Sequence, residues 1–447
     1  MLLSTKININ DSKVIIIFNL SFASVKNKNA VYLLFLANII SGLAQGISMI
    51  AIPWYFIEII EKPKFFTYCY FIITFLTFFW GMYAGTIIDR YSRKKIFLIT
   101  NFICGTIIAS VSAYGFCNQS TSEYLVILVF LITIFNYNVH YPNLYAFGQE
   151  ITEKKNYGKL NSYIEIQGQS TSMFAGAIAA ILLTGSSNDI ITFGGLNFNF
   201  PFNFKAWDIH EIFLMDAITY FISLLIIMLI KYVKIEKLNI ETGSLYDRFI
   251  SGLNFLKKRT YIFYFGLFSY MLFAFTLVQI HIILPLYVKN FLQMGADVYA
   301  SSEFYYSIGA IFSGIFVIRV FKNNYKLLGV IIFFTTISIF FYLISFINSV
   351  YLFFFTCLLL GITNAGVRVL RTTFLFNAIP NNIIGRATSV FSSINIIVRL
   401  FLIGIFSISF FQSDDNIKYS YLIGVVLLMS SAIPLALNYS KIIESEN

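Results

Sequence analysis

Twelve long apolar segments restrict what this chain can fold into. Each runs for about 20 to 28 residues with few charges, which is the length that an α-helix needs to cross the hydrocarbon core of a membrane. A membrane β-barrel would instead show alternating segments of about ten residues. Because 58% of the residues are hydrophobic and only 12% are charged, a soluble domain and a disordered chain are excluded. The sequence predicts an all-α membrane protein with twelve transmembrane helices.

Turn-forming and charged residues separate the expected helices. The break between the tenth and the eleventh rests on Pro380-Asn381-Asn382 and Gly385-Arg386. The helices form two groups of six, on either side of the long charged segment from Lys231 to Tyr261. Their approximate bounds are 31–58, 66–88, 96–117, 124–147, 159–184 and 211–232, then 262–288, 301–321, 327–347, 350–376, 387–411 and 418–439.

The distribution of lysine and arginine predicts the orientation. Alternate loops and the two termini hold 23 of these residues, and the other loops hold five. Since basic loops stay in the cytoplasm, both termini are expected there. A bias toward Ile, Asn, Lys and Phe is typical of an AT-rich bacterial genome, so we expect the bacterial inner membrane. The predicted parts are a cytoplasmic tail (1–29), a six-helix half (30–233), a cytoplasmic linker (234–261), a second six-helix half (262–440) and a cytoplasmic tail (441–447).

The two longest loops differ in character. The linker contains Ser244-Leu245-Tyr246-Asp247, a capping-box pattern typical of a helix start. Apolar residues then recur at helical spacing, which predicts an amphipathic helix along the inner membrane face. These residues are Leu245, Phe249, Leu253 and Leu256. The loop from Gly185 to His210 is placed outside and is rich in Asn, Gly and Phe.

The loop after the second helix carries the most specific motif. It reads Gly85-Thr86-Ile87-Ile88-Asp89-Arg90-Tyr91-Ser92-Arg93-Lys94-Lys95. The four cations hold the loop on the cytoplasmic side, and Asp89 is placed to cap a helix or to pair with an arginine. Gly85 is expected to let a neighbouring helix approach closely. A basic loop with no further role would not need this order of residues.

This loop resembles the signature loop of the major facilitator superfamily, G-x-L-x-D-R-x-G-R-R/K, and departs from it at Ser92, where the family usually has Gly. The resemblance implies a transporter with two six-helix halves, in which Asp89 helps to lock the inner gate. The gating loop would comprise Gly85, Asp89, Arg90, Arg93 and Lys94. A degenerate second copy, Gly314 to Lys322, follows the eighth helix and has Ile318 in place of the acid.

Further segments look like the branch of this family that contains macrolide efflux proteins and the enterobactin exporter. They include Ile52-Pro53-Trp54-Tyr55, Tyr141-Pro142-Asn143, Met215-Asp216-Ala217 and Ser251-Gly252-Leu253. The branch implies export of a small organic molecule, either a drug or a siderophore-like metabolite.

No ATP-binding loop is present, so an ion gradient or the substrate's own gradient must drive transport. Ionisable groups inside spans are candidates for proton coupling. Glu165 is the first choice, with a structural hydrogen bond as the alternative. His140 is a second candidate, although a neutral hydrogen-bonded histidine is the commoner outcome. For Asp216 we favour an acid that complements the dipole at the start of the sixth helix. Glu303 is placed near a span end.

Three arginines inside spans suggest a substrate class. Arg368 and Arg371 share a face of the tenth helix, and Arg399 lies near the middle of the eleventh. Either they line an electropositive cavity for an anionic substrate, or Arg371 extends to the inner surface while the others hold the halves together. The candidate cavity residues are Asn38, Gln45, Gln169, Gln279, Asn364, Arg368, Arg371, Asn395 and Arg399.

We therefore expect a secondary transporter that exports a small organic molecule by alternating access, coupled to protons. The alternatives are an importer or facilitator of the same fold, and a non-transporting membrane sensor or assembly factor. No clustered catalytic set is visible, and the four cysteines form no CxxC pair, so no enzyme, cofactor or metal site is predicted. Dispersed basic residues argue against nucleic-acid binding. The expected partners are a small-molecule substrate, protons and the lipid bilayer, with a monomer as the unit.

Overall fold

Twelve helices long and apolar enough to cross a membrane are present among the described residues. The computed structural model describes residues 27–153, 156–186, 190–199, 201–233, 245–321, 325–380 and 383–445. The predicted twelve-helix architecture is confirmed. The predicted tail up to residue 26 and the predicted cap Ser244 lie outside the described residues.

The first half begins with a helix that ends in a π-helical segment, Tyr55–Ile59. Pro63 starts the second helix, where its missing N–H costs nothing. A capping box between Asp208 and Glu211 starts the sixth. The six helices are α1 (Lys28–Trp54), α2 (Pro63–Arg90), α3 (Arg93–Asn118), α4 (Glu123–Ile151), α5 (Tyr157–Thr184) and α6 (Ile209–Leu229).

The second half begins with an irregular span from Thr260 to Leu292. It comprises α8 (Thr260–Ser269), α9 (Met271–Val278) and α10 (Leu284–Leu286), with π-helical segments at Gln279–Ile283 and Tyr287–Leu292. The tenth span ends at Ala378, two residues before Pro380, which confirms the predicted break at that proline. The remaining elements are α11 (Ala296–Val320), α12 (Lys326–Phe346), α13 (Val350–Ala378), α14 (Ile384–Phe406), α15 (Ser409–Gln412), a 3-10 turn (Asp414–Lys418), α16 (Tyr419–Leu437) and α17 (Tyr439–Glu444).

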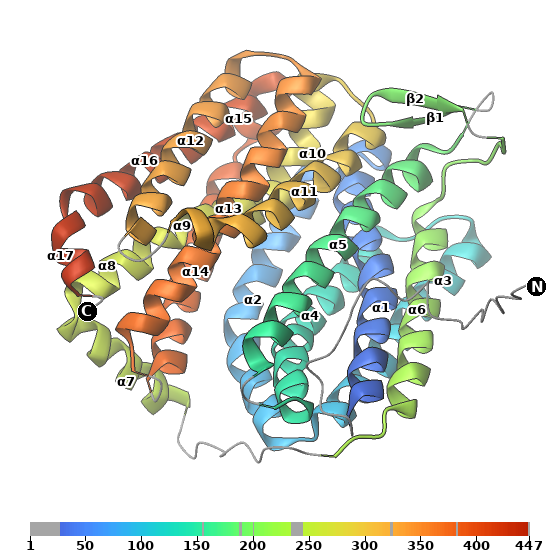
Figure 1. The fold of residues 1–447 in the computed structure, drawn as a ribbon. Helices are drawn as coiled ribbons and strands as arrows, with labels where there is room; N and C mark the ends of the chain where they lie inside the picture. The colour runs from blue at the N-terminus through green and yellow to red at the C-terminus, as the bar shows by residue number, and fades with distance from the viewer. Residues whose placement is uncertain are drawn as a thin grey trace, which may run out of the picture.

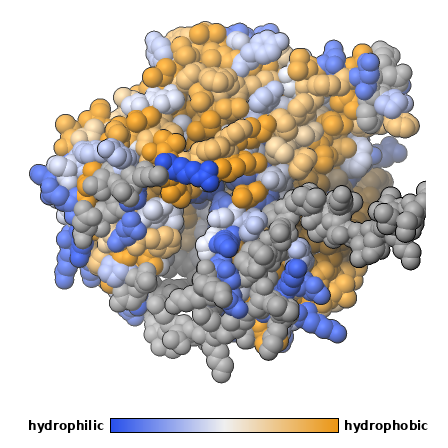
Figure 2. All heavy atoms as spheres, in the orientation of Figure 1, coloured by the Kyte–Doolittle hydropathy of each residue, from blue (hydrophilic) through white to orange (hydrophobic). Residues whose placement is uncertain are grey.

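The two halves lie side by side, meet at one end and diverge toward the other (Figure 1). We call the upper end in Figure 1, which bears the two strands β1 (Ile190–Phe193) and β2 (Leu196–Asn199), the hairpin end. The lower end, near α7 (Leu245–Lys258), is the linker end. Hydrophobic residues cover most of the upper part of the face shown in Figure 2, and hydrophilic residues gather lower down. Among the spans of the second half, Phe401 and Val426 are 69% and 67% exposed, which is the surface expected for helices in contact with lipid.

The predicted amphipathic helix is present as α7 (Leu245–Lys258). Phe249 and Leu253 pack on the hydrophobic core, and Leu256 is fully buried in it. The backbone of α7 lies close to the start of α14, because a Cβ on Gly252 would meet the Arg386 carbonyl oxygen at 2.5 Å. The helix therefore packs against the second half.

The outer loop contains a β-hairpin that the sequence did not lead us to expect. Strands β1 (Ile190–Phe193) and β2 (Leu196–Asn199) pair antiparallel. Gly194 and Gly195 form the two-residue turn with φ of 60° and 75°, which only glycine adopts without strain. The turn reaches the second half, where the Gly194 N–H donates to Ser301 Oγ (2.9 Å) and the Gly195 N–H to Asp297 Oδ2 (3.2 Å).

Candidate functional site: a cavity between the two halves

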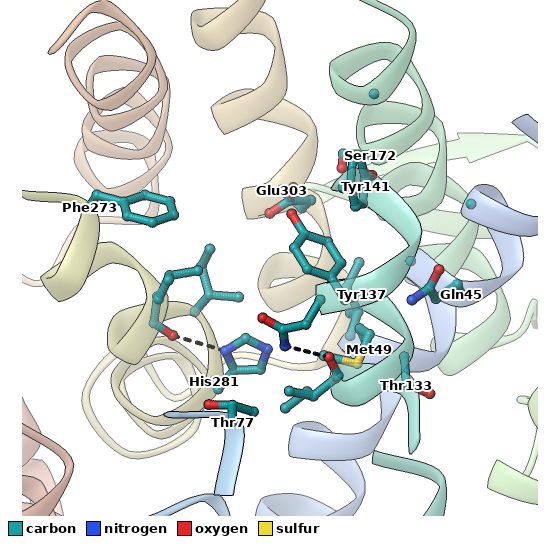
Figure 3. Close-up of a pocket in the computed structure, with 18 of the residues that line it drawn as sticks. Gln45, Met49, Thr77, Thr133, Tyr137, Tyr141, Ser172, Phe273, His281 and Glu303 are labelled. Atoms are coloured by element: carbon teal, nitrogen blue, oxygen red, sulfur yellow. Dashed lines mark hydrogen bonds between the residues drawn. The ribbon is translucent and has the colours of Figure 1, made fainter. Parts of the chain in front are cut away.

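A cavity of about 420 Å³ lies between the two halves (Figure 3). Helices α1, α2, α4 and α5 of the first half and α9, α11 and α14 of the second contribute to its wall. Its polar and aromatic lining includes Asn38, Gln45, Tyr70, Thr74, Thr77, Tyr137, Asn138, Tyr141, Gln167, Ser172, Tyr270, His281, Glu303, Asn395 and Arg399. A volume of this size suits a small organic molecule.

Four of the nine candidate cavity residues, Asn38, Gln45, Asn395 and Arg399, line this cavity. The other five are placed elsewhere among the described residues. Gln279 donates to Tyr421 Oη (3.5 Å) and Asn364 to Tyr306 Oη (2.8 Å), both within the second half. Gln169 is partly buried on α5. Arg368 and Arg371 each have partners of their own.

Arg371 is buried inside the second half. Its Nη1 donates to the Ser269 carbonyl oxygen (3.1 Å), and its guanidinium carbon lies 3.5 Å from the centroid of the Tyr270 ring. A cation on an aromatic face is favourable where water is excluded. Arg371 therefore does not extend to the inner membrane surface, which was one of the two alternatives drawn from the sequence.

Arg368 and Glu165 form an ion pair between the halves. Arg368 Nη2 on α13 lies 2.9 Å from Glu165 Oε2 on α5. The Tyr145 hydroxyl on α4 donates to the other carboxylate oxygen at 2.6 Å. The charge of Glu165 therefore influences how α5 and α13 are held together.

Arg399 shares one part of the cavity with an aromatic pair. The Tyr70 and His281 rings lie 5.1 Å apart, and Tyr70, His281 and Arg399 all line the cavity. His281 Nδ1 donates to the Leu277 carbonyl oxygen, four residues earlier in the chain (2.9 Å). This ring nitrogen is therefore not available to a ligand.

Glu303 is a cavity residue that the sequence reasoning missed. Helix α11 begins at Ala296, five residues before the expected start, so Glu303 lies two turns inside the span and faces the cavity. Its placement near a span end was therefore wrong. Ser172 on α5 lies near its carboxyl group in Figure 3. The break at Gly295, followed by an acid at Asp297, was the sequence signal for the earlier start.

The other two proton-coupling candidates lie inside the first half. His140 Nε2 donates to Asn38 Oδ1 (2.6 Å). Ser48 donates to Asp216 Oδ2 (2.8 Å), and Asp216 is fully buried. Helix α6 begins at Ile209, so Asp216 lies two turns inside it. The expectation that Asp216 complements the helix dipole was wrong, because Asp208 and Glu211 occupy that position.

The basic residues after α2 hold the first half together at the linker end. Lys94 donates to the carbonyl oxygens of Met228 and Ile230 (2.9 and 2.8 Å) and so caps the end of α6. Arg93 lies 3.7 Å from Glu150, and Arg90 is exposed. The side chain of Asp89 lies outside the described part of the structure.

The close helix approach expected at Gly85 is not found. A Cβ built on Gly85, or on Gly314 in the degenerate second copy, would meet no described atom within 4 Å. Both glycines lie toward the linker end, where the two halves diverge, and this separation explains the open space around them.

The hairpin end, by contrast, is closed by contacts between the halves. The Trp54 ring on α1 stacks on Tyr299 of α11 with centroids 5.3 Å apart. Lys289 lies 3.2 Å from a Glu58 carboxylate oxygen, and Phe193 of the hairpin packs edge-on against Phe304. The cavity is therefore sealed from the hairpin end.

Comparisons with known proteins agree with this architecture. The profile of the Major Facilitator Superfamily matches residues 34–402. The chain belongs to this superfamily. It is therefore a multi-pass membrane protein of a transporter family, with two six-helix halves around a central cavity. No curated protein sequence matches the chain.

Solved structures of superfamily members share the fold at low sequence identity. A mutant of the nucleoside transporter NupG is 14% identical with a TM-score of 0.65, and the match covers 90% of this chain and 99% of that one. A D-xylose–proton symporter is 11% identical with a TM-score of 0.64, covering 91% and 96%. A bacterial homologue of the iron transporter ferroportin, in an inward-facing state, is 15% identical with a TM-score of 0.63, covering 92% and 98%.

Proposed function

We propose that this protein is a secondary transporter that carries a small polar organic molecule across the bacterial inner membrane by alternating access. The observation that carries the proposal is the cavity, which both halves line and which contacts between the halves seal at the hairpin end. The basic loops support a cytoplasmic position for the linker end, and with that orientation the state proposed here is inward-facing. Since one chain contains both halves, we propose a monomer as the functional unit.

We further propose that transport is export, coupled to inward movement of protons. The direction is supported by the sequence segments that resemble the efflux branch. Coupling is supported by the pair between Glu165 and Arg368. Protonation of Glu165 removes its attraction to Arg368, so proton binding would change how firmly α5 of one half holds α13 of the other. Closure of the linker end would involve the Asp89 loop, as in the superfamily.

The test measures uptake into inverted membrane vesicles whose lumen is made acidic. The solutes are catecholate and carboxylate siderophores, macrolides, lipophilic cations, nucleosides and sugars, first ranked by the thermal stabilisation that each gives to the purified protein. An exporter accumulates its solute in these vesicles, and a protonophore abolishes the accumulation. Uptake only into right-side-out vesicles would establish an importer, and no uptake of any solute would overturn the transport proposal.

Two variants test the coupling. Glu165→Gln should abolish the dependence of uptake on the pH gradient, because the glutamine amide cannot release a proton. Glu123→Gln is the matched control, because Glu123 pairs with Lys62 at the hairpin end, away from the cavity. Equal pH dependence in both variants would remove Glu165 from the coupling mechanism.

A further inference from the structure

The cavity is lined by one acidic and one basic side chain that have no counter-ion among the described residues. Glu303 on α11 and Arg399 on α14 both line it, and neither forms an ion pair with a described residue. Arg368 differs from them in this respect, because its Nη2 lies 2.9 Å from Glu165 Oε2. A charge held at membrane depth without a partner is costly, and such groups persist in membrane proteins where function needs them.

The two charges lie in different parts of the cavity. Glu303 lies near Ser172 and Tyr141 in Figure 3, and His281 and Thr77 lie at the other end of the view, with Tyr137 between them. Arg399 belongs to the His281 end, because it interacts electrostatically with both His281 and Tyr70, whose ring packs on His281. A ligand that reaches from one charge to the other must therefore extend along the cavity.

Each end also has the chemistry to bind one kind of charged group. Around Glu303, Tyr137 and Tyr141 line the cavity with aromatic rings, a group that can attract cations. Arg399 Nε is buried and has no partner among the described residues, so it is free to donate to an anion. Thr77 and Asn395 line the same cavity and supply further donors.

We propose that the cavity binds an amphoteric solute, with its acidic group against Arg399 and its basic group against Glu303. The proposal rests on the transport function proposed above and names its substrate class. An anion alone would leave Glu303 unpaired, and a cation alone would leave Arg399 unpaired, whereas a molecule that carries both groups neutralises both. A charge-assisted hydrogen bond at each end would select for this class.

The first test needs no ligand and uses the Tm of the purified full-length protein. Glu303→Gln and Arg399→Gln should each leave the Tm unchanged or raise it, because each removes a charge that has no partner. The control is Glu150→Gln, which should lower the Tm because it removes the carboxylate that pairs with the largely buried Arg93. A lower Tm in the Glu303 or Arg399 variant, equal to that of the control, would show that the charge is already paired and would overturn the proposal.

The second test measures affinity for sets of probes that differ only in charge. Each amino acid or dipeptide is used as the zwitterion, the N-acetylated anion, the amidated cation and the doubly blocked neutral form. Blocking either group should weaken binding to the wild-type protein by about tenfold or more, the effect of one buried charged hydrogen bond. In Arg399→Gln, blocking the acidic group of the probe should cause no further loss of affinity. In Glu303→Gln, blocking the amine should cause no further loss of affinity.

Three outcomes overturn the proposal. They are anions that bind as tightly as zwitterions, variants that weaken all four forms equally, and no binding by any zwitterion in the set. Proton-driven uptake of an anionic or neutral solute would refute the amphoteric class and leave the transport function intact. Absence of uptake for every solute would refute the transport function itself.

Discussion

Gly176 on α5 allows the two halves to close at the hairpin end. A Cβ at this position would lie 2.9 Å from the Ala300 carbonyl oxygen and 3.0 Å from the Phe304 backbone nitrogen, both on α11 of the other half. These are backbone atoms, so no side-chain rotation can relieve the contact. In Gly176→Ala, either α5 or α11 must move away as a whole.

The size of the effect follows from this contact. Overpacking of a tight interface costs typically about 1–3 kcal/mol, and the cost falls only on the state in which the hairpin end is closed. The gain in helix propensity from glycine to alanine is the same in both states and cancels. The ratio of open to closed hairpin ends should therefore rise by about 5- to 150-fold.

Cysteine labelling measures this ratio. Thr77, which lines the cavity, is changed to cysteine in a background without the four native cysteines, and a membrane-impermeant thiol reagent is added to intact cells. Gly176→Ala should label faster than the parent. The matched control is Gly158→Ala on the same helix, where a Cβ would meet no described atom within 4 Å. Equal labelling rates for the two variants would refute the argument that this contact holds the hairpin end closed.

Three further outcomes are expected. Gly361→Ala should lower the free energy of unfolding by about 1–3 kcal/mol, because the new Cβ would collide with the Tyr306 carbonyl oxygen; Gly314→Ala, which has open space, should show no such loss in a thermal melt. Asp89→Asn should reduce solute uptake while the amount of folded protein in the membrane stays the same, and normal uptake would remove its gating role. Replacing 190–199 by a Gly-Ser linker should speed labelling of the cavity from outside, because the hairpin contacts to α11 are lost; an unchanged rate would show that the hairpin does not hold the halves together.

The helices themselves could be predicted because their signal is local. A bilayer fixes the length of each apolar segment, and every span bounded in this way is present in the structure. The amphipathic helix α7 was equally visible, because Phe249, Leu253 and Leu256 repeat at helical spacing and do pack on the core. The superfamily was also accessible from the order of residues between Gly85 and Lys95, which a basic loop alone would not require.

The contents of the cavity could not be predicted in the same way. The spans are apolar on all sides, so periodicity does not reveal which face turns inward. Arg368 and Arg371 have the same sequence signature as Arg399, yet only Arg399 lines the cavity. Glu303 was overlooked because its importance depended on a helix start that moved by five residues.

The sequence by itself determined the number of spans, their break points and the amphipathic linker helix, because the membrane imposes these on each segment separately. The tertiary structure decided the partners: Glu165 with Arg368 across the halves, the hairpin turn on Ser301, and Glu303 and Arg399 facing one cavity. These contacts join residues more than a hundred positions apart or depend on the rotation of whole helices. They follow from how twelve helices pack together, and no local pattern in the chain encodes them.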